Sequence, residues 1–578
     1  MNDIRRTILW VIFGFSMVLL WDKWQVYNGR QATFFPSPAT QTTASTSSAH
    51  PASSPASMPA ASPSAAQPPQ PAAPSASAAA VPTTAPAQPA IAHELVTVST
   101  DVLKLTFDNE GGSLVKGELL HHKGSQDDPK PFVLLEEDAR HLYVAQTGLI
   151  GGPFPTHKTI MHVAPGPREL GSADNELTVR FESPDLGGVK LVKTYTLKRG
   201  AYDIAVRHEV VNTGTAAVAP QLYLQLVRDG KEPDGAVPFY STFTGPAVYT
   251  SAKKYQKITF KAIREKKVEI PAESTDGYIA MVQHYFATAW LLPEGTPRQL
   301  HVNAADIGSQ VPDCCYRAQE ITPFGELAPG QTKTIDARLF VGPQVETVLE
   351  GLTPGLELIK DYGYLTILAK PLYWLLEKIH NLLGNWGWSI VGLVVLLKLA
   401  FYWLNAKAYS SMAKMKALNP RIQDLRGRLK DKPQQMQQEM MRIYREEKVN
   451  PLGGCLPIAI QIPVFIALYW VLLSSVEMRH APWIGWVTDL STKDPYFILP
   501  ILMTISTLFQ TALNPAPPDP MQAKLMWIMP LAFSFMFFMF PAGLVLYWLT
   551  NNILSIAQQW VINTRLGVPP RLHLPKFR

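Results

Sequence analysis

Five long apolar stretches near the C-terminal end decide what this chain can fold into. They are Trp386–Leu404, Leu452–Val476, Tyr496–Leu513, Leu525–Phe540 and Ala542–Ile562, and only Pro541 separates the last two. A helix of about 20 apolar residues matches the hydrocarbon thickness of a bilayer. We therefore predict a polytopic α-helical membrane protein with spans in residues 384–405 and 451–563. The third and fourth stretches are short, which favours local thinning of the bilayer.

A single ionisable residue lies within these stretches. Lys398, in the run WGWSIVGLVVLLKLAFYWL, is the only Lys, Arg, Asp, Glu or His in all five. A charge in hydrocarbon is unfavourable, so an intramembrane ionisable residue marks a functional site by default. The lone cation predicts a wet cavity that receives a negatively charged guest. The alternative is that its long side chain reaches the lipid headgroups.

Basic segments predict the orientation. Residues 406–449 contain 11 Lys and Arg against 5 Asp and Glu, and the tail 564–578 is basic as well. Basic loops remain in the cytoplasm. Arg5 and Arg6 precede the apolar run Thr7–Trp21, which predicts an uncleaved N-terminal transmembrane anchor over residues 1–25. Both termini are therefore predicted to be cytoplasmic, and the region between the anchor and residue 384 periplasmic.

The periplasmic region has two parts. Residues 26–92 are mostly Pro, Ala, Ser, Thr and Gln, a composition that cannot bury enough apolar surface and predicts a disordered tether. Residues 93–350 contain runs of period two, such as NELTVRFES and TKTIDARLFVGP, separated by Gly, Pro and Asn. Such runs are typical of antiparallel strands. Their length predicts one large all-β sandwich.

The β-region has no recognisable catalytic or metal motif. Its histidines include His121, His122, His141, His157 and His162, without the HExxH spacing of a zinc site. They are predicted to be surface and loop residues, with a catalytic or sugar-binding cleft as the alternative. Cys314 and Cys315 are adjacent, and a bridge between neighbours is strained, so these two and Cys455 are expected to be free thiols. No cofactor, metal or enzymatic activity is expected.

Residues 364–383 predict an amphipathic helix on the outer membrane surface. One stripe consists of Leu368, Leu372, Leu375, Leu376, Ile379, Leu382 and Leu383. Glu377, Lys378 and Asn381 lie opposite, and Tyr373 and Trp374 favour an interfacial position. Burial of this helix against the β-region is the alternative.

The polar residues of the apolar stretches gather at the cytoplasmic ends. Lys398 precedes Leu404 by six residues, which is about 9 Å at 1.5 Å per residue. The same level holds Gln461, Thr507, Gln510, Thr550, Asn551, Asn552, Ser555, Gln558 and Gln559, whereas the outer halves are apolar. This asymmetry predicts a hydrophilic groove open only to the cytoplasm. The alternative for the amides is hydrogen bonding between helices.

Residues 406–450 predict a cytoplasmic helical hairpin. Its first helix has a heptad seam, namely Met415, Leu418, Ile422, Leu425 and Leu429. Pro420 interrupts this seam, so a kink or break is expected near Asn419. A second helix starts at Pro433 and carries Met436, Met440 and Ile443 on one face.

The first helix of the hairpin also has a basic face. Its predicted contact residues are Lys414, Lys416, Arg421, Arg426 and Arg428. Anionic lipids, ribosomal RNA and acidic nascent chains are the partners that such a face suits. A solvated positive face without a specific partner is the alternative.

Several strings resemble the YidC/Oxa/Alb membrane-protein insertase family, and its Gram-negative YidC branch most closely. They are GNWGWSI, SMAKMKALNP, EKVNPLGGCLPIAIQIPVFIALY, DPYFILPIL, DPMQAKLMWIMP and FPAGLVLYW. The resemblance covers residues 384–562 almost without a gap. It implies an inner-membrane insertase and chaperone that acts on nascent membrane proteins, alone or with the Sec translocon, and that works with ribosomes.

The resemblance also assigns roles to residues. Lys398 takes the place of the groove cation, which is usually Arg in the family, so charge attraction is retained without bidentate pairing. Val394 stands where some relatives carry a hydroxyl group. The positions associated with the groove and a hydrophobic slide are Gln461, Phe465, Met503, Met536, Tyr547 and Trp548. The family's β-domain resembles sugar-epimerase sandwiches, with no basis for catalysis in this sequence.

Two other functions remain as alternatives. A small-solute transporter usually has paired repeats and interrupted helices that meet at the midplane, which one off-centre lysine fits poorly. A membrane-tethered periplasmic carbohydrate-active protein would need converging carboxylates within residues 94–345.

Overall fold

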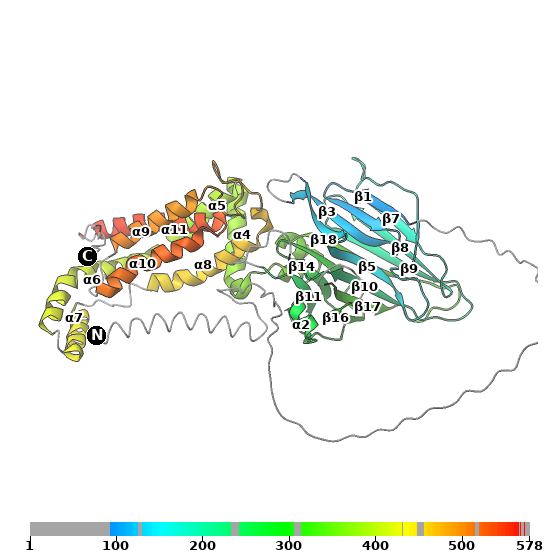
Figure 1. Cartoon of the computed structure of the whole chain (residues 1–578), viewed down its shortest axis with the longest axis horizontal. Helices are drawn as coiled ribbons and strands as arrows, with labels where there is room; N and C mark the ends of the chain where they lie inside the picture. The colour runs from blue at the N-terminus through cyan, green and yellow to red at the C-terminus, as the bar shows by residue number, and fades with distance from the viewer. Residues whose placement is uncertain are drawn as a thin grey trace, which may run out of the picture. The chain divides into compact units, whose positions relative to one another are not determined.

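The computed structural model describes residues 93–124, 130–232, 242–305, 314–429, 432–447, 456–514 and 520–565, with residues 567 and 572 (Figure 1). The predicted anchor and tether, residues 1–92, lie outside the described residues. So does Cys455. The described chain forms an all-β part followed by a helical part, which confirms the predicted combination of a large β-sandwich with a helical region.

Two nine-stranded antiparallel sheets form the β-part in the described residues. The first sheet runs, in spatial order, β1 (Leu95–Ser99), β2 (Leu103–Asp108), β3 (Ser113–Lys123), β4 (Pro131–Glu137), β5 (Leu142–Ile150), β10 (Gln221–Arg228), β17 (Tyr316–Pro323), β16 (Arg298–Ala304) and β13 (Glu273–Ser274). The second runs β12 (Lys254–Lys257), β11 (Gly245–Thr250), β14 (Tyr278–Gln283), β15 (Phe286–Leu291), β18 (Thr332–Pro343), β9 (Asp203–Asn212), β8 (Val189–Lys198), β7 (Glu176–Glu182) and β6 (His162–Val163).

The period-two pattern explains how the two sheets share one core. Along β7, Leu177, Val179 and Phe181 are buried, and the residues between them are exposed. Successive side chains of a strand point to opposite faces, so this alternation turns one apolar face inward. Leu105 of the first sheet and Leu339 of the second belong to the same buried cluster. The sandwich is therefore held together by the inner faces of both sheets.

One prediction about the β-part is wrong. Cys314 and Cys315 are joined by a disulfide, not free thiols, because the chain at this point brings the two neighbouring side chains together. The five histidines singled out from the sequence are exposed or half-buried: His121, His122, His141, His157 and His162.

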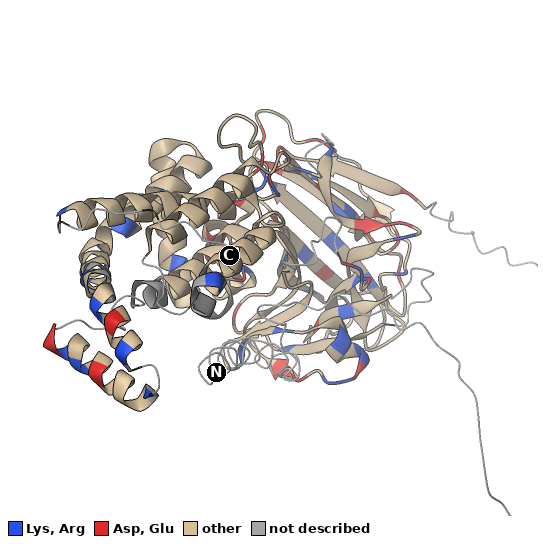
Figure 2. Ribbon diagram, turned by 60° about the vertical axis from the view of Figure 1, so that its left-hand side comes forward, with Lys and Arg blue, Asp and Glu red and all other residues tan. Residues whose placement is uncertain are grey.

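The helical part follows the β-part and begins after a short helix within it, α2 (Phe260–Arg264). Its elements are α3 (Glu346–Leu352), η1 (Leu356–Ile359), η2 (Gly363–Leu365), α4 (Thr366–Leu383), α5 (Trp386–Ala400), α6 (Tyr402–Arg428), α7 (Pro433–Glu446), α8 (Leu456–Ser474), η3 (Val476–Met478), α9 (Ile498–Leu513), α10 (Pro520–Phe537) and α11 (Ala542–Arg565). Charged residues are sparse on the described parts of α8 to α11 and frequent on the α6–α7 hairpin (Figure 2).

The predicted span Trp386–Leu404 is divided in the structure. Asn385 caps α5 by accepting the N–H of Trp388 at 3.0 Å. The helix ends where Phe401 leaves helical geometry, at φ −92° and ψ 9°. By length and hydropathy, no single helix among the described residues qualifies as a membrane span, whereas Trp386–Ala400 and Tyr402–Ser411 qualify as a pair joined by a 64° bend.

The predicted break near Asn419 does not occur. Helix α6 continues through Pro420 to Arg428. A proline removes one hydrogen bond from a helix, which packing can offset. Here Ile422 of α6 and Ile443 of α7 are buried where the two helices pack against each other.

The leucine stripe of α4 serves two surfaces. Leu372, Leu375 and Ile379 pack against the core of the helical part, whereas Leu368 and Leu382 are exposed. Helix α4 contacts α5 and α8. The stripe is therefore partly consumed by helix packing.

Candidate functional site

Lys398 lies on the wall of a cavity enclosed by α5, α6, α8, α9 and α11. The lining consists of Lys398, Asn405, Ala408, Tyr409, Gln461, Ile462, Phe465, Gln510, Asn514, Tyr547, Trp548, Asn551, Asn552, Ser555 and Gln559. The volume of this Lys398 cavity is about 260 Å³. A water molecule occupies about 30 Å³ in the liquid, so the cavity has room for several.

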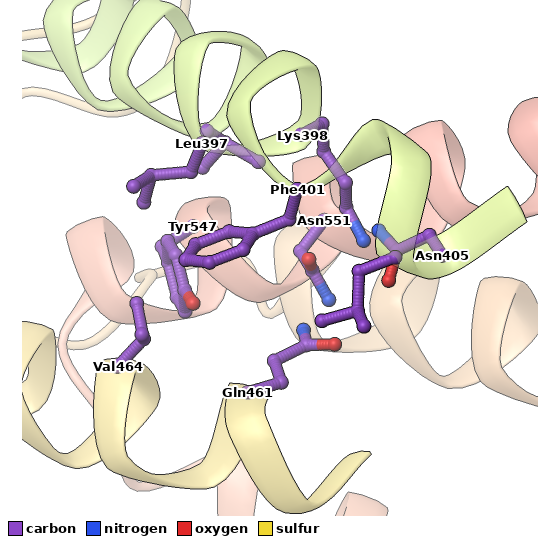
Figure 3. Close-up of a pocket in the computed structure, with 10 residues that line it drawn as sticks. Leu397, Lys398, Phe401, Asn405, Gln461, Val464, Tyr547 and Asn551 are labelled. Atoms are coloured by element: carbon purple, nitrogen blue, oxygen red, sulfur yellow. The ribbon is translucent and has the colours of Figure 1, made fainter. Parts of the chain in front are cut away.

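A smaller recess of about 40 Å³ adjoins the Lys398 cavity (Figure 3). The polar ends of Lys398, Asn405, Gln461 and Asn551 converge there from three different helices. The opposite wall is apolar and consists of Val394, Leu397, Phe401, Leu404 and Val464. The bend at Phe401 places its ring in this wall, so the break in the helix is part of the site.

The Lys398 ammonium has a neutral partner. Its Nζ donates a hydrogen bond of 2.7 Å to Ser555 Oγ. Ser555 Oγ in turn donates to the backbone carbonyl of Asn551 at 2.7 Å. Among the residues that the structure describes, no carboxylate lies within ion-pair distance of Lys398. Lys398 also lies in the last turn of α5, where the partial negative charge of the helix end favours a cation.

A second set of polar groups joins α9 to α11. Asn552 Nδ2 donates to Thr507 Oγ1 at 2.8 Å and contacts Ser506 Oγ at 3.3 Å. One turn or more further along, Gln559 Nε2 donates to Asn514 Oδ1 at 3.2 Å. We call these five residues the α9–α11 seam. Their hydrogen bonds hold two helices together, as the alternative reading of the amides expected.

The structure brings most of the predicted groove residues together. Lys398, Gln461, Gln510, Asn551, Asn552 and Ser555 line the Lys398 cavity. Thr507 is absent from that lining, and its hydroxyl donates to the Met503 carbonyl at 2.9 Å. It therefore belongs to the seam.

The residues predicted for the hydrophobic slide are dispersed. Phe465, Tyr547 and Trp548 line the Lys398 cavity, and the Phe465 ring meets the Trp548 ring edge to face at 4.3 Å. Met503 is buried in the core, whereas Met536 is exposed on α10. The five side chains do not form one continuous surface.

Sequence reasoning missed Asn405, Tyr409 and Asn514 as cavity residues. Asn405 follows the last apolar residue of its stretch and was assigned to the cytoplasmic hairpin. Its Nδ2 donates to Gln558 Oε1 at 3.3 Å. The available signal was its spacing from Lys398, which is seven residues, or two helical turns.

Ion pairs occupy part of the basic face on the hairpin. Arg421 pairs with Glu447 at 3.3 Å, and Arg428 pairs with Asp424 at 2.7 Å. Lys414 is exposed. The side chains of the remaining two predicted contacts, Lys416 and Arg426, lie outside the described part of the chain.

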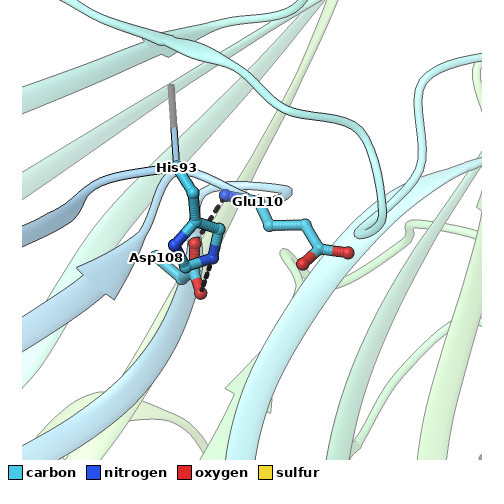
Figure 4. A group of neighbouring side chains, drawn as sticks. All are labelled: His93, Asp108 and Glu110. Atoms are coloured by element: carbon cyan, nitrogen blue, oxygen red, sulfur yellow. Dashed lines mark hydrogen bonds and ion pairs between the residues drawn. The ribbon is translucent and has the colours of Figure 1, made fainter. Parts of the chain in front are cut away.

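Acidic clusters in the β-part were tested as metal sites. His93, Asp108 and Glu110 have ligand atoms within 4.8 Å of one another (Figure 4). Asp108 already accepts the backbone N–H of Glu110 at 2.8 Å and contacts His93 Nε2 at 3.0 Å. Lys158 Nζ lies 3.8 Å from Glu110. A lysine already occupies this side of the cluster, so we assign no metal to it.

A second acidic cluster gives the same result. It consists of Glu136, Asp138 and His141. The backbone N–H groups of Arg140 and His141 both donate to Asp138 Oδ1 at 2.6 Å. That carboxylate already caps a turn.

His157 is the histidine of the β-part that most resembles an acid–base group. Its Nδ1 lies 2.5 Å from the hydroxyl of Tyr223. Burial lowers the pKa of His157 to about 4, and the charged groups that reinforce the shift are Lys158, Lys193 and Arg317. All three are cations, so the carboxylate partner expected of a carbohydrate-active site is not among them.

Comparisons with known proteins agree over nearly the whole chain. A family model described as "60Kd inner membrane protein" matches residues 378–568, and one described as "YidC periplasmic domain" matches residues 95–375. The "Membrane protein insertase YidC" of Cupriavidus metallidurans is 56% identical over 565 residues, covering 98% of each chain. The protein of the same name from Ralstonia nicotianae is 54% identical over 569 residues, again covering 98% of each.

A solved structure is also similar. It is described as "Active YidC insertase crystal structure with the first transmembrane domain resolved". It is 20% identical with a TM-score of 0.37, and the match covers 81% of this chain and 92% of that chain.

Proposed function

Because the chain belongs to the YidC family of membrane protein insertases, we propose that it inserts its clients through the Lys398 cavity. The family places it in the inner membrane with a periplasmic β-domain, and makes nascent membrane proteins its substrates. The observation that carries the proposal is the lone ammonium of Lys398 in a polar cavity, bonded to a neutral hydroxyl.

The proposed mechanism needs no covalent chemistry. Transfer of apolar client surface from water into lipid releases about 25 cal/mol per Å². The obstacle is the polar flank of the client, because a charge in hydrocarbon is unfavourable. A cavity that holds water and one cation would shelter an acidic flank while the apolar segment passes between the helices into the bilayer. The exposed apolar faces of α9 and α10 suit such a segment.

The proposal extends to partners and orientation. We infer a chaperone role for membrane-protein folding, alone or with the Sec translocon, and contacts of the hairpin with ribosomes and anionic lipids. The exposed Lys414 supports these contacts, whereas Arg421 and Arg428 are already engaged with carboxylates. Cytoplasmic termini follow from the basic loops.

Reversal of the groove charge tests the proposal. Lys398→Glu is expected to lower insertion of a client with an acidic flank by about tenfold or more, because attraction becomes repulsion at short range. Insertion is measured as protease protection of the client in proteoliposomes. Lys398→Arg is expected to insert the same client at nearly the wild-type rate, because the charge is kept.

The control is a client of the same apolar sequence whose flank carries amides in place of carboxylates. Its insertion is expected to respond little to Lys398→Glu. Equal insertion of the acidic client by the wild type and the Glu variant would remove the groove-charge mechanism.

A further inference from the structure

We propose that Ser555 is a positioning residue, which fixes the Lys398 ammonium on the cavity wall and leaves its remaining protons for client carboxylates. The inference rests on the proposed function of the Lys398 cavity and adds a residue that acts through Lys398.

The hydrogen-bond directions at Ser555 define its role. A serine hydroxyl has one proton to donate and two lone pairs that accept. The proton of Ser555 is used by the Asn551 carbonyl at 2.7 Å, within the same helix. The oxygen is therefore left as an acceptor, and Lys398 Nζ donates to it at 2.7 Å. With its proton used, this hydroxyl favours the cation of the site and offers nothing to a carboxylate.

The remaining valence of Lys398 is what a client would use. An ammonium has three N–H donors. Ser555 takes one of them, and no carboxylate pairs with Lys398 in the described part of the chain. The other donors lie at a cavity of about 260 Å³, which has room for water or a carboxylate. The site therefore offers a single client carboxylate one or two charge-assisted hydrogen bonds.

A fixed position matters because lysine is flexible. Its four-carbon stem lets an ammonium near a helix end move to the lipid headgroups. Ser555 is buried on α11, so its hydroxyl provides an acceptor on the side of the cavity. The end of α5 at Ala400 adds its partial negative charge close to Lys398. These neutral groups stabilise the cation without an acidic residue that would compete with the client.

The test compares two buried serines of the same kind. Ser534 of α10 is buried, and its hydroxyl donates to the Pro530 carbonyl at 2.8 Å, as Ser555 does to its own helix. Ser534 does not line the Lys398 cavity. In the proteoliposome assay with full-length protein, Ser555→Ala is expected to lower insertion of the acidic-flank client by about tenfold. Ser534→Ala is expected to insert it as the wild type does, and Ser555→Thr, which keeps the hydroxyl, is expected to restore most of the rate.

A double-mutant cycle separates positioning from packing. In a Lys398→Gln background, Ser555→Ala is expected to cause no further loss, because the group it positions is gone. The amide-flank client is expected to be inserted equally by Ser555→Ala and the wild type. A loss that persists in the Lys398→Gln background, or that is equal for both clients, would make Ser555 a packing residue and overturn the inference.

The outcomes also distinguish this inference from the proposed function. If Lys398→Gln impairs the acidic client and Ser555→Ala does not, Ser555 has no positioning role and the groove mechanism stands. If Lys398→Gln inserts the acidic client normally, both proposals are wrong.

Discussion

Glu320 shows how one buried side chain links the β-domain to pH. It is fully buried on β17, and burial raises its pKa to about 7. Its Oε1 accepts the N–H of Ile279 at 2.9 Å, and Arg298 lies 3.9 Å from Oε2. The folded chain therefore keeps a proton on Glu320 up to about pH 7, whereas the unfolded chain releases it near pH 4.5. Between these values ionisation favours unfolding, so the contribution of Glu320 to stability falls as the pH rises.

Glu320→Gln is expected to remove this pH dependence. The stability of the variant relative to the wild type should rise between about pH 4.5 and 7, by up to the order of 3 kcal/mol. Hydrogen exchange of the β14 and β17 amides in the full-length protein measures the difference. Buried histidines act in the opposite sense, since burial lowers the pKa of His208 to about 3, but they are the same in both proteins.

Glu176→Gln serves as the control, because Glu176 is an exposed glutamate on β7. A stability difference between Glu320→Gln and the wild type that does not change with pH would show that Glu320 is ionised in the folded protein throughout this range.

The sequence reveals single residues only when their chemistry is out of place. Lys398 was predicted because a charge among apolar residues has no bland surroundings to explain it. Ser555 was predicted to lie at the same level, but its bond to Lys398 depends on the rotation of α5 against α11. Asn405 was missed because the bend at Phe401 decides that a residue beyond the apolar stretch returns to the cavity. Such rotations and bends come from packing, which no local pattern records.

At the level of elements, a buried polar network ties α4 to its neighbours. The Lys360 side chain is fully buried, and its Nζ lies 3.5 Å from Glu477 of η3. Tyr373 of α4 donates to the same carboxylate oxygen at 2.6 Å. The Lys360 ammonium also lies 3.8 Å from the centre of the Tyr373 ring. Glu477 is thus the single acid that balances a buried cation and a helix contact together.

Glu477→Ala is expected to destabilise the helical part by about 3 kcal/mol, because it leaves Lys360 buried without its counter-charge. Thermal unfolding of the protein in detergent, followed by cysteine-reactive or fluorescent probes, measures the effect. Glu350→Ala is the matched control, since Glu350 is more exposed and lies 3.6 Å from Lys370. It is expected to change stability by less than about 1 kcal/mol. Similar unfolding temperatures for Glu477→Ala and the wild type would show that solvent reaches Lys360.

Elements were predicted from the sequence where one interaction dominates their formation. The alternation of β7 and the leucine stripe of α4 both follow from burial of a single face. The predicted break at Pro420 was wrong because packing against α7 outweighs one lost hydrogen bond. The actual break at Phe401 has no proline or glycine to announce it.

At the level of the whole molecule, the two architectures were visible in the sequence as a change of period from two to that of a helix. The junction between them was not, because Glu346, Lys360 and Tyr362 precede the apolar stretches yet interact with the helical part. Tyr362 belongs to the helical core cluster, and its hydroxyl donates to Glu346. Lys370 of α4 pairs with Glu346 at 3.1 Å.

Two deletions are expected to differ for this reason. Removal of residues 94–344 should leave insertion of a model client close to the wild-type rate, because the helical core keeps its contacts. Removal of residues 94–362 should abolish it, because the Glu477 network and Tyr362 are lost with the segment. Both are measured in membranes depleted of the wild-type protein.

The same pair of deletions addresses the carbohydrate-active alternative. A periplasmic enzyme would lose its activity in both deletions, and so a full loss with residues 94–344 would contradict the insertase reading. Equal activity of the two deletions would instead show that the 345–362 segment is dispensable.

The bend at Phe401 has a mechanical consequence. A straight rod would transmit a push on the cytoplasmic hairpin along its own axis into the bilayer. A rod bent by 64° converts that push into a sideways swing of Tyr402–Ser411, the segment that carries Asn405 and Ala408 on the cavity wall. Load applied at the far tip of the hairpin is thereby felt as leverage on the width of the entrance.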